Sequence, residues 1–500
     1  MERTEILVKK AAVIGGGLGG LACAIRLAAG GWKVTVCEQQ PKLGGKLQRI
    51  DAEGYRFDRG PSTITMLDSF EAVFASAGRK MEHYLSFYPI HPLTRNLFAD
   101  GHIVDAVKDR VRMMEQIARY SPEDARNFPA FMEEAGQMYR IGKQQFLNKL
   151  LLDWKDKVSL PMAASFFRIR PFTKLQGMLR RYFRHPNTLA LFGRYATYVG
   201  SSPYSAPAVF SMLASLEADE GIYGVKGGTY EIVKAFTKLA QELGVEILAS
   251  TAVEEIRMNG GRASGVMTSG GFLQADAVIA NGDVLSVYEK LVPQRYRPSM
   301  SQNKIERYEP SLSGFVTLLG VKKKYDLLKH HTVFFPQNYS DEFNDIFVKR
   351  VAPKDPTLYI CCTSGTEPET APAEGSSLFV LANAPYVTDA WDWQKERDSY
   401  REHVKRKLES AGLTGLALQT EVEITYTPLD LERDTSAYKG AIYGISSNSS
   451  RQTFARPANR SKDIDGLWFV GGTTHPGGGT PVVTASGRLV AERILQEYSV

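Results

Sequence analysis

Residues 11–38 combine an apolar strand, a glycine-rich turn, a helix of small residues and a second strand that ends in an acid. The first strand (11–14) leads into Gly15-x-Gly17-x-x-Gly20. These glycines allow a sharp turn, a close approach to a pyrophosphate and tight packing of the helix on the strand. The free N–H groups at Leu18, Gly19 and Gly20 would add partial positive charge at the pyrophosphate. We therefore expect an adenine dinucleotide at this end of the chain.

The residues that follow indicate which dinucleotide is bound. Glu38 stands 18 residues after Gly20, where it would accept hydrogen bonds from the ribose hydroxyls and repel a 2′-phosphate. Gly44-Gly45 allow backbone contact along an extended dinucleotide, which favours FAD over NAD, although a plain loop is the alternative. Lys46 and Arg59 would either contact phosphate or be solvated. Gly60-Pro61 complete this candidate cofactor segment.

A second glycine-rich segment, GLWFVGGTTHPGGGTPVVTASGRLVAERI, lies at residues 466–494. Together with residues 15–61, 198–213 and 221–247, it makes the chain resemble the flavin-dependent amine oxidase and phytoene desaturase superfamily, in particular its bacterial carotenoid desaturase branch. The resemblance spans nearly the full chain. It implies an α/β fold, with an FAD-binding Rossmann-like domain of the amine-oxidase type and an inserted α+β substrate domain. It further implies cofactor contacts at Val253, through its backbone, and in a helix-starting element with Gly471, Gly472, Pro481, Val482 and Val483.

Two activities within that branch fit the chain. Its desaturases usually read nearer to HPGAG-x-P, whereas residues 475–487 read HPGGGTPVVTASG. This variant is more similar to the diaponeurosporene oxidases, which oxidise the terminal methyl of C30 carotenoids to an aldehyde. The resemblance therefore favours an FAD-dependent oxidase of a hydrophobic acyclic carotenoid. The alternatives are a phytoene or diapophytoene desaturase, a carotenoid isomerase, an amine oxidase-type enzyme and a non-catalytic lipid-handling protein.

The implied chemistry needs few catalytic side chains. A flavin takes the hydride from an allylic carbon, which explains why no Ser-His-Asp or paired-acid pattern is present. Oxygen or a quinone would accept the electrons. His475 is the candidate catalytic residue, as an acid/base group or by polarising the flavin, and its alternative role is to shape the loop. Residues 466–490 contain no cysteine that would tether the flavin, which disfavours an amine oxidase-type enzyme.

Composition excludes several other classes. The chain has 500 residues with 43% hydrophobic content, which suits a large core and two domains. A net charge of +6 without a nucleic-acid motif argues against nucleic-acid binding. Four cysteines (Cys23, Cys37, Cys361 and Cys362) are too few for a disulfide framework and suit a reducing cytoplasm. His330, His331 and His403 have no carboxylate or cysteine partner at metal spacing, so we expect no metal.

The pattern along the chain predicts a substrate domain inserted in two pieces. Residues 1–105, 220–289 and 431–500 are assigned to FAD binding, and residues 106–219 and 290–430 to the substrate domain. Ser121 and Pro122 are typical of a helix start. A hairpin turn at Gly270-Gly271 precedes a predicted strand over 271–280. Further strands are predicted over 314–322 and 377–386, and a helix over 393–411.

Residues 166–184 interleave aromatic and leucine side chains with basic ones: Arg168, Arg170, Lys174, Arg180, Arg181 and Arg184. A cationic amphipathic stretch of this kind can lie in the headgroup layer of a bilayer, although an ordinary solvated helix is the alternative. A C30 polyene must be taken from a membrane, which favours docking. No signal peptide and no run of about 18 apolar residues is visible. We therefore expect a cytoplasmic protein attached peripherally to the cell membrane.

Overall fold

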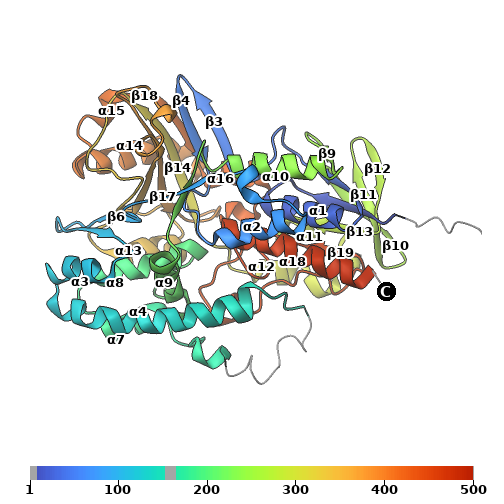
Figure 1. The fold of residues 1–500 in the computed structure, drawn as a ribbon, viewed down its shortest axis with the longest axis horizontal. Coiled ribbons are helices and arrows are strands. Elements are labelled where there is room, and N and C mark those ends of the chain that lie inside the picture. The colour runs from blue at the N-terminus through green and yellow to red at the C-terminus, as the bar shows by residue number, and fades with distance from the viewer. Residues whose placement is uncertain (1–7, 153–164, 499–500) are drawn as a thin grey trace, which may run out of the picture.

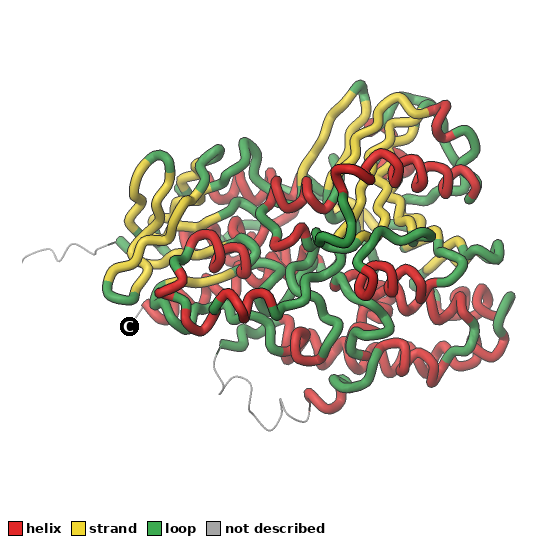
Figure 2. Tube along the Cα trace, turned by 180° about the vertical axis from the view of Figure 1, so that it is seen from behind, coloured by secondary structure: helices red, strands yellow, loops and turns green. Residues whose placement is uncertain are grey.

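The computed structural model describes residues 8–152 and 165–498. Two groups of strands, each with its own helices, form two regions of the molecule (Figures 1 and 2). A five-stranded sheet organises the region on the right of Figure 1, and a seven-stranded sheet organises the region on the left. The two sheets and the helices between them set the walls of one large cavity.

The five-stranded sheet is parallel, and its strands come from three distant parts of the chain. Its order is β19 (Leu467–Phe469), β13 (Ala277–Ala280), β1 (Lys10–Ile14), β2 (Lys33–Cys37) and β9 (Glu246–Leu248). The central strands are apolar because a parallel sheet is covered on both faces. Ala11 and Val13 of β1 pack toward the helices, whereas Ala12 packs toward the opposite face.

Three helices cover the first face of this sheet: α1 (Leu18–Ala29), α10 (Glu231–Glu242) and α18 (Thr480–Tyr498). The opposite face is covered by α11 (Val284–Leu291) and by a three-stranded antiparallel sheet. That sheet consists of β10 (Val253–Asn259), β11 (Arg262–Thr268) and β12 (Gly271–Gln274). The first and last segments of the chain thus pack on one another, as α1 and α18 do beside each other in Figure 1.

The single strand predicted over 271–280 is wrong, because the chain forms two strands there. β12 pairs antiparallel with β11, whereas β13 pairs parallel with β1 in the other sheet. Residues 275–276 make the crossing, and the Asp276 carboxylate accepts a hydrogen bond from the Lys10 backbone N–H at 2.8 Å. The expected hairpin turn before β12 is present, with Thr268 opposite Gly271.

The seven-stranded sheet is antiparallel except where β15 meets β6. Its order is β18 (Thr420–Tyr426), β14 (Ser313–Val321), β17 (Ser376–Ala384), β16 (Leu358–Cys362), β15 (His331–Phe334), β6 (Thr94–Leu97) and β7 (Ile103–Ala106). α14 (Trp393–Ser410) buries Trp393, Tyr400 and Val404 against one face. The hairpin of β3 (Gln48–Ala52) and β4 (Tyr55–Arg59) packs on the other through Tyr55 and Phe57. The segment 1–105 expected to belong to the cofactor domain therefore contains two strands that pair in this second sheet.

A helical layer lies below the seven-stranded sheet in Figure 1. It contains α3 (Arg110–Ala118), α4 (Pro122–Gly142), α7 (Leu175–Tyr182), α8 (Pro186–Gly193) and α9 (Met212–Asp219). As predicted, the Ser121 side chain caps α4 by accepting the Asp124 N–H at 3.3 Å. The other helices and strands are α2 (Leu67–Ser76), β5 (Phe87–Pro89), β8 (Tyr223–Val225), α12 (Gln302–Glu306), α13 (Tyr339–Asn344), α15 (Leu416–Gln419), α16 (Pro428–Thr435) and α17 (Ser450–Phe454).

Residues 166–184 do not form one continuous amphipathic helix. Residues 165–168 make a short helical turn, Arg170 has a left-handed φ of 50°, and α7 begins only at Leu175. The apolar side of α7 packs into the helical layer, where Met178 and Leu179 are fully buried. The large apolar side chains left exposed in this segment are Phe167 and Phe172, at 69% and 75%. None of the described helices is long and apolar enough to cross a membrane.

Candidate active site

One cavity of about 930 Å³ lies between the two regions and is lined from both ends of the chain. It brings together nearly all the residues that the sequence singles out. Those on its wall are Gly15, Gly17, Leu18, Gly19, Glu38, Gly44, Gly45, Lys46, Gly60, Pro61, Val253, Gly471, Gly472, His475, Pro481, Val482 and Val483. Gly20 is not on the wall; it lies one step behind, where α1 packs on the turn.

The glycine turn between β1 and α1 leaves no room for side chains. Gly15 has a φ of +98°, which favours glycine, and a Cβ at Gly20 would lie 2.3 Å from the Gly15 carbonyl oxygen. The crossing of α1 with α18 is equally tight, because a Cβ at Gly487 would lie 2.0 Å from the Gly19 carbonyl oxygen. Close contact of these helices holds the two ends of the chain at one site.

Two helix N-termini reach the cavity. Gly17, Leu18 and Gly19 open α1 there, and residues 480–483 open α18, close to the predicted start at Val482. Neither Gly17 nor any other side chain caps α1. The first N–H groups of a helix have no intrahelical acceptor and carry partial positive charge. Both ends therefore suit anionic groups of a ligand.

Glu38 follows β2 and is buried, at 5% exposure. One carboxylate oxygen accepts the Gly16 N–H at 2.7 Å, and the other accepts the Gln40 N–H at 2.8 Å. These bonds fix the carboxylate on the cavity wall beside the glycine turn. Each oxygen keeps a further lone pair with which to accept a ligand hydroxyl.

The solvated alternative for Lys46 is wrong. Its ammonium group donates to the carbonyl oxygens of Ala441, at 3.1 Å, and of Ile442. Burial lowers the pKa of Lys46 to about 8, although nearby Asp283 favours the charged form. Gly44 turns the chain just before it with a φ of +121°. Lys46 thus connects the N-terminal glycine segment to residues 441–442, and its role toward phosphate stays a prediction.

Arg59 is not simply solvated either. Its guanidinium group forms an ion pair with Asp434 at 2.7 Å and lies over the Tyr426 ring, with 4.4 Å between the guanidinium carbon and the ring centroid. All three residues line the cavity. The pair joins the end of β4 to the segment after β18.

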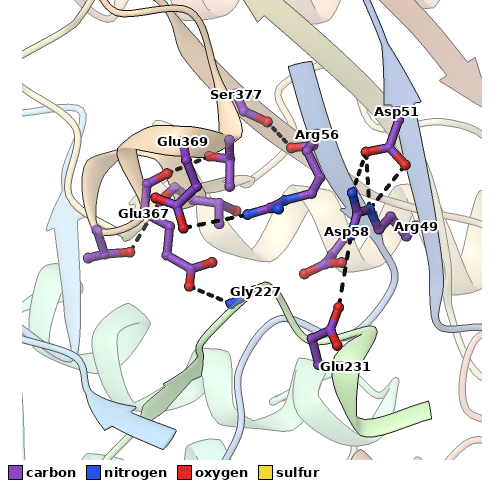
Figure 3. Close-up of polar contacts among 12 residues, drawn as sticks. Arg49, Asp51, Arg56, Asp58, Gly227, Glu231, Glu367, Glu369 and Ser377 are labelled. Atoms are coloured by element: carbon purple, nitrogen blue, oxygen red, sulfur yellow. Dashed lines mark hydrogen bonds and ion pairs between the residues drawn. The ribbon is translucent and has the colours of Figure 1, made fainter. Parts of the chain in front are cut away.

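Figure 3 shows how the β3–β4 hairpin is held in place behind this wall. The printed contacts join Arg49 to Asp51 and Glu231, Arg56 to Glu369 and Ser377, and Glu367 to Gly227. Asp58 of the same hairpin accepts the N–H groups of Thr229 and Tyr230 at the start of α10. Because β4 leads directly into Gly60-Pro61, these contacts position the cofactor segment against the second sheet.

The structure places His475 on the cavity wall, with its ring turned to a backbone acceptor. Its Nε2 lies 2.8 Å from the Lys149 carbonyl oxygen, and its own carbonyl accepts from Asn459 Nδ2 at 2.9 Å. Both bonds shape the loop before α18. A catalytic role for His475 stays a prediction.

A buried polar group on the cavity wall was not predicted from the sequence. Arg194 lies 3.6 Å from Glu217 and donates to Tyr198 Oη at 3.0 Å, while Tyr195 donates to Glu217 at 2.8 Å. Arg194 and Glu217 are 5% and 1% exposed. Arg194 Nε and Glu217 Oε1 have no hydrogen-bond partner within the described parts of the chain. Buried polar atoms are normally paired, so these two mark a place where a ligand would bind.

The sequence analysis also missed Asn281, Asp283, Tyr359, Tyr443 and Arg456, which line the same cavity. Asn281 follows the carboxyl end of β13, where ligands of parallel sheets are usually bound, so that signal was available. Arg456 donates to the Gly472 carbonyl at 3.1 Å, and burial lowers its pKa to about 10. Nothing in the local sequence marks Tyr359 or Arg456, because long-range folding brings them to the site.

The expectation that His330 and His331 have no cysteine partner is wrong. Cys361 Sγ lies 3.6 Å from His330 Nε2, and all three residues are buried. Burial lowers the pKa of His330 to about 4 and raises the pKa of Cys361 to about 12. The antiparallel pairing of β15 with β16 makes this contact, and sequence spacing does not reveal it.

Comparison with known proteins agrees with this arrangement. The model of the family described as flavin containing amine oxidoreductase matches residues 18–495. A 4,4′-diapolycopene oxygenase of Methylomonas sp is 35% identical over 97% of this chain and 98% of its own length. A 4,4′-diaponeurosporene oxygenase of Staphylococcus haemolyticus is 33% identical over 97% of both chains.

Solved structures share the fold. A putrescine oxidase bound to putrescine superposes with a TM-score of 0.62 at 14% identity, covering 98% of this chain and 99% of that one. A cyclohexylamine oxidase from Brevibacterium oxydans gives a TM-score of 0.61 at 14% identity, covering 99% and 100%. The amine-oxidase type of fold expected from the sequence is thereby confirmed.

Proposed function

Because the chain belongs to the flavin containing amine oxidoreductase family, we propose that it binds FAD and oxidises the terminal methyl of an acyclic C30 carotenoid to an aldehyde. The observation that carries this proposal is one continuous cavity, whose wall passes from dinucleotide-type glycines to aromatic and aliphatic side chains. Relatives named 4,4′-diapolycopene and 4,4′-diaponeurosporene oxygenases, 33–35% identical over nearly the whole chain, support the substrate class.

The residues present fit FAD. At Gly17 and Gly19 a Cβ would come within 2.9 and 2.7 Å of the Asn281 side chain, so only bare backbone can face a pyrophosphate there. The α1 N-terminus would hold that pyrophosphate, Glu38 the ribose, and the α18 N-terminus the isoalloxazine, as the family resemblance implies. When bound, the flavin supplies a hydride acceptor that no protein side chain offers.

The apolar part of the wall suits a polyene. Side chains from the helical layer, the seven-stranded sheet and the loop before α17 form it: Phe146, Leu147, Leu151, Phe166, Phe210, Leu213, Leu216, Val316, Val333, Phe379, Leu381, Ile442 and Phe454. Such a lining would hold a long hydrocarbon by burial of its surface. It would also exclude water from the reacting carbon until the oxygen donor is admitted.

The polar group around Arg194 favours oxygenation over desaturation. A pure hydrocarbon leaves Arg194 Nε and Glu217 Oε1 without partners, which is costly in a buried site. A hydroxyl on the substrate end would donate to Glu217 and accept from Arg194, and a carbonyl would accept from Arg194. These residues would thereby retain the alcohol for its second oxidation.

The overall conversion consists of two oxidations, methyl to alcohol and alcohol to aldehyde. With water as the oxygen donor, each oxidation releases two electrons and two protons, and oxygen or a quinone is the final electron acceptor. A desaturase is the second candidate, favoured by the apolar lining alone. It would release two hydrogens per double bond and use neither Arg194 nor Glu217 in this way.

We further propose that the protein takes its substrate from the cytoplasmic face of the cell membrane. Phe167 both lines the cavity and is 69% exposed, so the cavity reaches the surface at this residue. Exposed Phe172 and the exposed basic residues Arg168, Lys174, Arg180, Arg181 and Arg184 surround this opening in the sequence. Aromatic side chains in the acyl layer with cations on phosphates are typical of a peripheral membrane surface.

The test is product analysis with the purified protein and vesicles that contain diaponeurosporene. We expect a product that has gained one oxygen and lost two hydrogens, together with an alcohol at early times. Labelled water and labelled oxygen, used in parallel, identify the oxygen donor. Loss of hydrogens without gain of oxygen would establish the desaturase instead.

A further inference from the structure

Three side chains converge behind the cavity wall, outside the proposed cofactor and substrate site. His330 precedes β15, His331 is the first residue of that strand, and Cys361 lies opposite His331 in β16. Each offers one ligand atom, and these atoms lie within 4.8 Å of one another. His330, His331 and Cys361 are 8%, 1% and 4% exposed.

Hydrogen bonds orient the His330 ring toward the cysteine. Thr366 Oγ1 donates to the Thr363 carbonyl at 3.2 Å, so it accepts from His330 Nδ1, which lies 2.7 Å away. His330 Nε2 then carries the lone pair, and it points at Cys361 Sγ. A second-shell bond of this kind fixes the tautomer of histidines that bind metals.

His331 has an unsatisfied ring nitrogen at the same place. Its Nδ1 lies 2.7 Å from Tyr359 Oη, while its Nε2 is buried and lacks a hydrogen-bond partner among the residues that the structure describes. An unpaired polar atom on a side chain that is 1% exposed needs an explanation. A bound ion would provide the missing partner.

We propose that His330, His331 and Cys361 bind a zinc ion. Two imidazoles and one thiolate are a donor set that zinc prefers, with bonds of about 2.0–2.3 Å. Such bonds place the ligand atoms roughly 3.3–3.8 Å apart. The His330–Cys361 pair already has this separation, at 3.6 Å. A small inward shift of His331 completes the set, water takes the fourth position, and the Cys361 thiol proton is released to the solvent.

The ion would act as a positioning site for the cavity. It would fasten the start of β15 to β16, and through His331 it would fix Tyr359. Tyr359 lines the cavity and lies 2.6 Å from Ser62 Oγ, directly after the cofactor segment that ends at Pro61. This inference does not depend on the identity of the flavin or of the substrate.

The experiment measures metal in the purified flavoprotein. After removal of loosely bound ions with a chelator resin, we expect about one equivalent of zinc per chain by elemental analysis. Protein stripped of metal and titrated with Co²⁺ should show a thiolate-to-cobalt charge-transfer band in the near ultraviolet. Cys361→Ser should lose this band, and both Cys361→Ser and His330→Gln should lower zinc affinity at least tenfold.

The matched control is Cys362→Ser. Cys362 is the neighbouring buried cysteine, but its sulfur faces Ser364 Oγ at 3.6 Å rather than the histidines, so its variant should keep the metal and the band. Flavin absorbance and elution volume establish that each variant is folded, and His330→Gln serves if Cys361→Ser is not. Absence of bound zinc and of any cobalt band in the wild-type protein would overturn the proposal. Equal metal affinity in wild type and in both ligand variants would overturn it as well.

Discussion

The side chain of Asn281 takes the space next to three glycines. A Cβ at Gly17, Gly19 or Gly20 would lie 2.9, 2.7 or 2.9 Å from Asn281 atoms, and Asn281 Nδ2 donates to the Gly15 carbonyl at 3.2 Å. The asparagine therefore keeps the glycine turn in one shape. Any side chain at these glycines must displace it or enter the cavity.

Replacing Gly17 by Val should abolish flavin retention, because the new side chain meets Asn281 and fills the cavity at the start of α1. The measurement is the ratio of flavin absorbance to protein absorbance after purification. Gly177→Ala is the control: nothing lies within 4 Å of its Cβ, and alanine should stabilise α7 by up to about 1 kcal/mol. Normal flavin content in Gly17→Val would refute the assignment of the glycine turn.

A double substitution tests the polar group in the cavity. Arg194→Met with Glu217→Met removes both charges together, because either single change would leave an unpaired buried charge worth roughly 3–5 kcal/mol of stability. We expect the first oxidation to continue and the alcohol to accumulate, measured as the alcohol-to-aldehyde ratio. An unchanged ratio would show that these residues do not hold the oxygenated end.

Individual residues could be predicted from the sequence where a local pattern constrains them. Gly15, Gly17 and Glu38 belong to one short strand-turn-helix-strand unit, and the structure places all three on the cavity wall. Lys46 was ambiguous, because its partners are backbone carbonyls nearly four hundred residues away in sequence. Cys361 and His330 meet only through strand pairing.

At the level of elements, α13 shows how buried charge connects separate segments. Glu342 of α13 is 1% exposed and accepts hydrogen bonds from the Thr357 N–H at 3.0 Å and from Asn383 Nδ2 of β17 at 3.0 Å. Burial raises the pKa of Glu342 to about 7, because desolvation outweighs these bonds. The link between the helix and the sheet is therefore sensitive to pH.

This raised pKa predicts a loss of stability as pH rises. The unfolded carboxyl releases its proton near pH 4.5, whereas the folded one holds it until about pH 7. The folded state thus binds more protons between these values, and stability falls across that window. Wild type should lose about 1–3 kcal/mol more than Glu342→Gln between pH 5 and 8 in denaturant titrations. Parallel curves for the two proteins would contradict the assignment.

Elements with a strong local pattern were predictable, and those decided by a partner were not. The start of α4 was predicted from Ser121 and Pro122, and the helix begins there. The chain break at residues 275–276 was missed, because two different sheets compete for an unbroken apolar run. The apolar side of α7 was expected to face a membrane, but the helical layer buries Met178 and Leu179.

For the whole molecule, the opening at Phe167 predicts which surface meets the bilayer. α7 lies at the lower edge of the molecule in Figure 1, away from α14 at the upper edge. Substitution of Arg180, Arg181 and Arg184 by Glu, or of Phe167 and Phe172 by Asp, should reduce co-sedimentation with anionic vesicles severalfold.

The control for this experiment places the same charge reversal on α14, as Lys395→Glu with Arg406→Glu, both exposed. These changes should leave vesicle binding close to that of wild type. Equal losses in both sets of variants would mean that net charge, rather than this surface, drives binding.

The architecture of the whole molecule was predictable only in outline. The family resemblance gave the fold and the joining of residues 11–61 with residues 466–490, because both segments carry strong motifs. It did not reveal that β6 and β7 pair in the seven-stranded sheet, since their short sequences carry no sign of a partner more than two hundred residues away.

The tight crossing of Gly19 with Gly487 has a consequence for biogenesis. The helix that completes the cradle is among the last segments to leave the ribosome, so a nascent chain cannot retain its cofactor cotranslationally. Until then a greasy hollow stands open beside the translating complex, where a chaperone or the bilayer itself would shield it. Cofactor loading is therefore the closing event of maturation, and a chain stopped before Thr480 should emerge apo, however well its first five hundred nanoseconds or minutes of folding proceed.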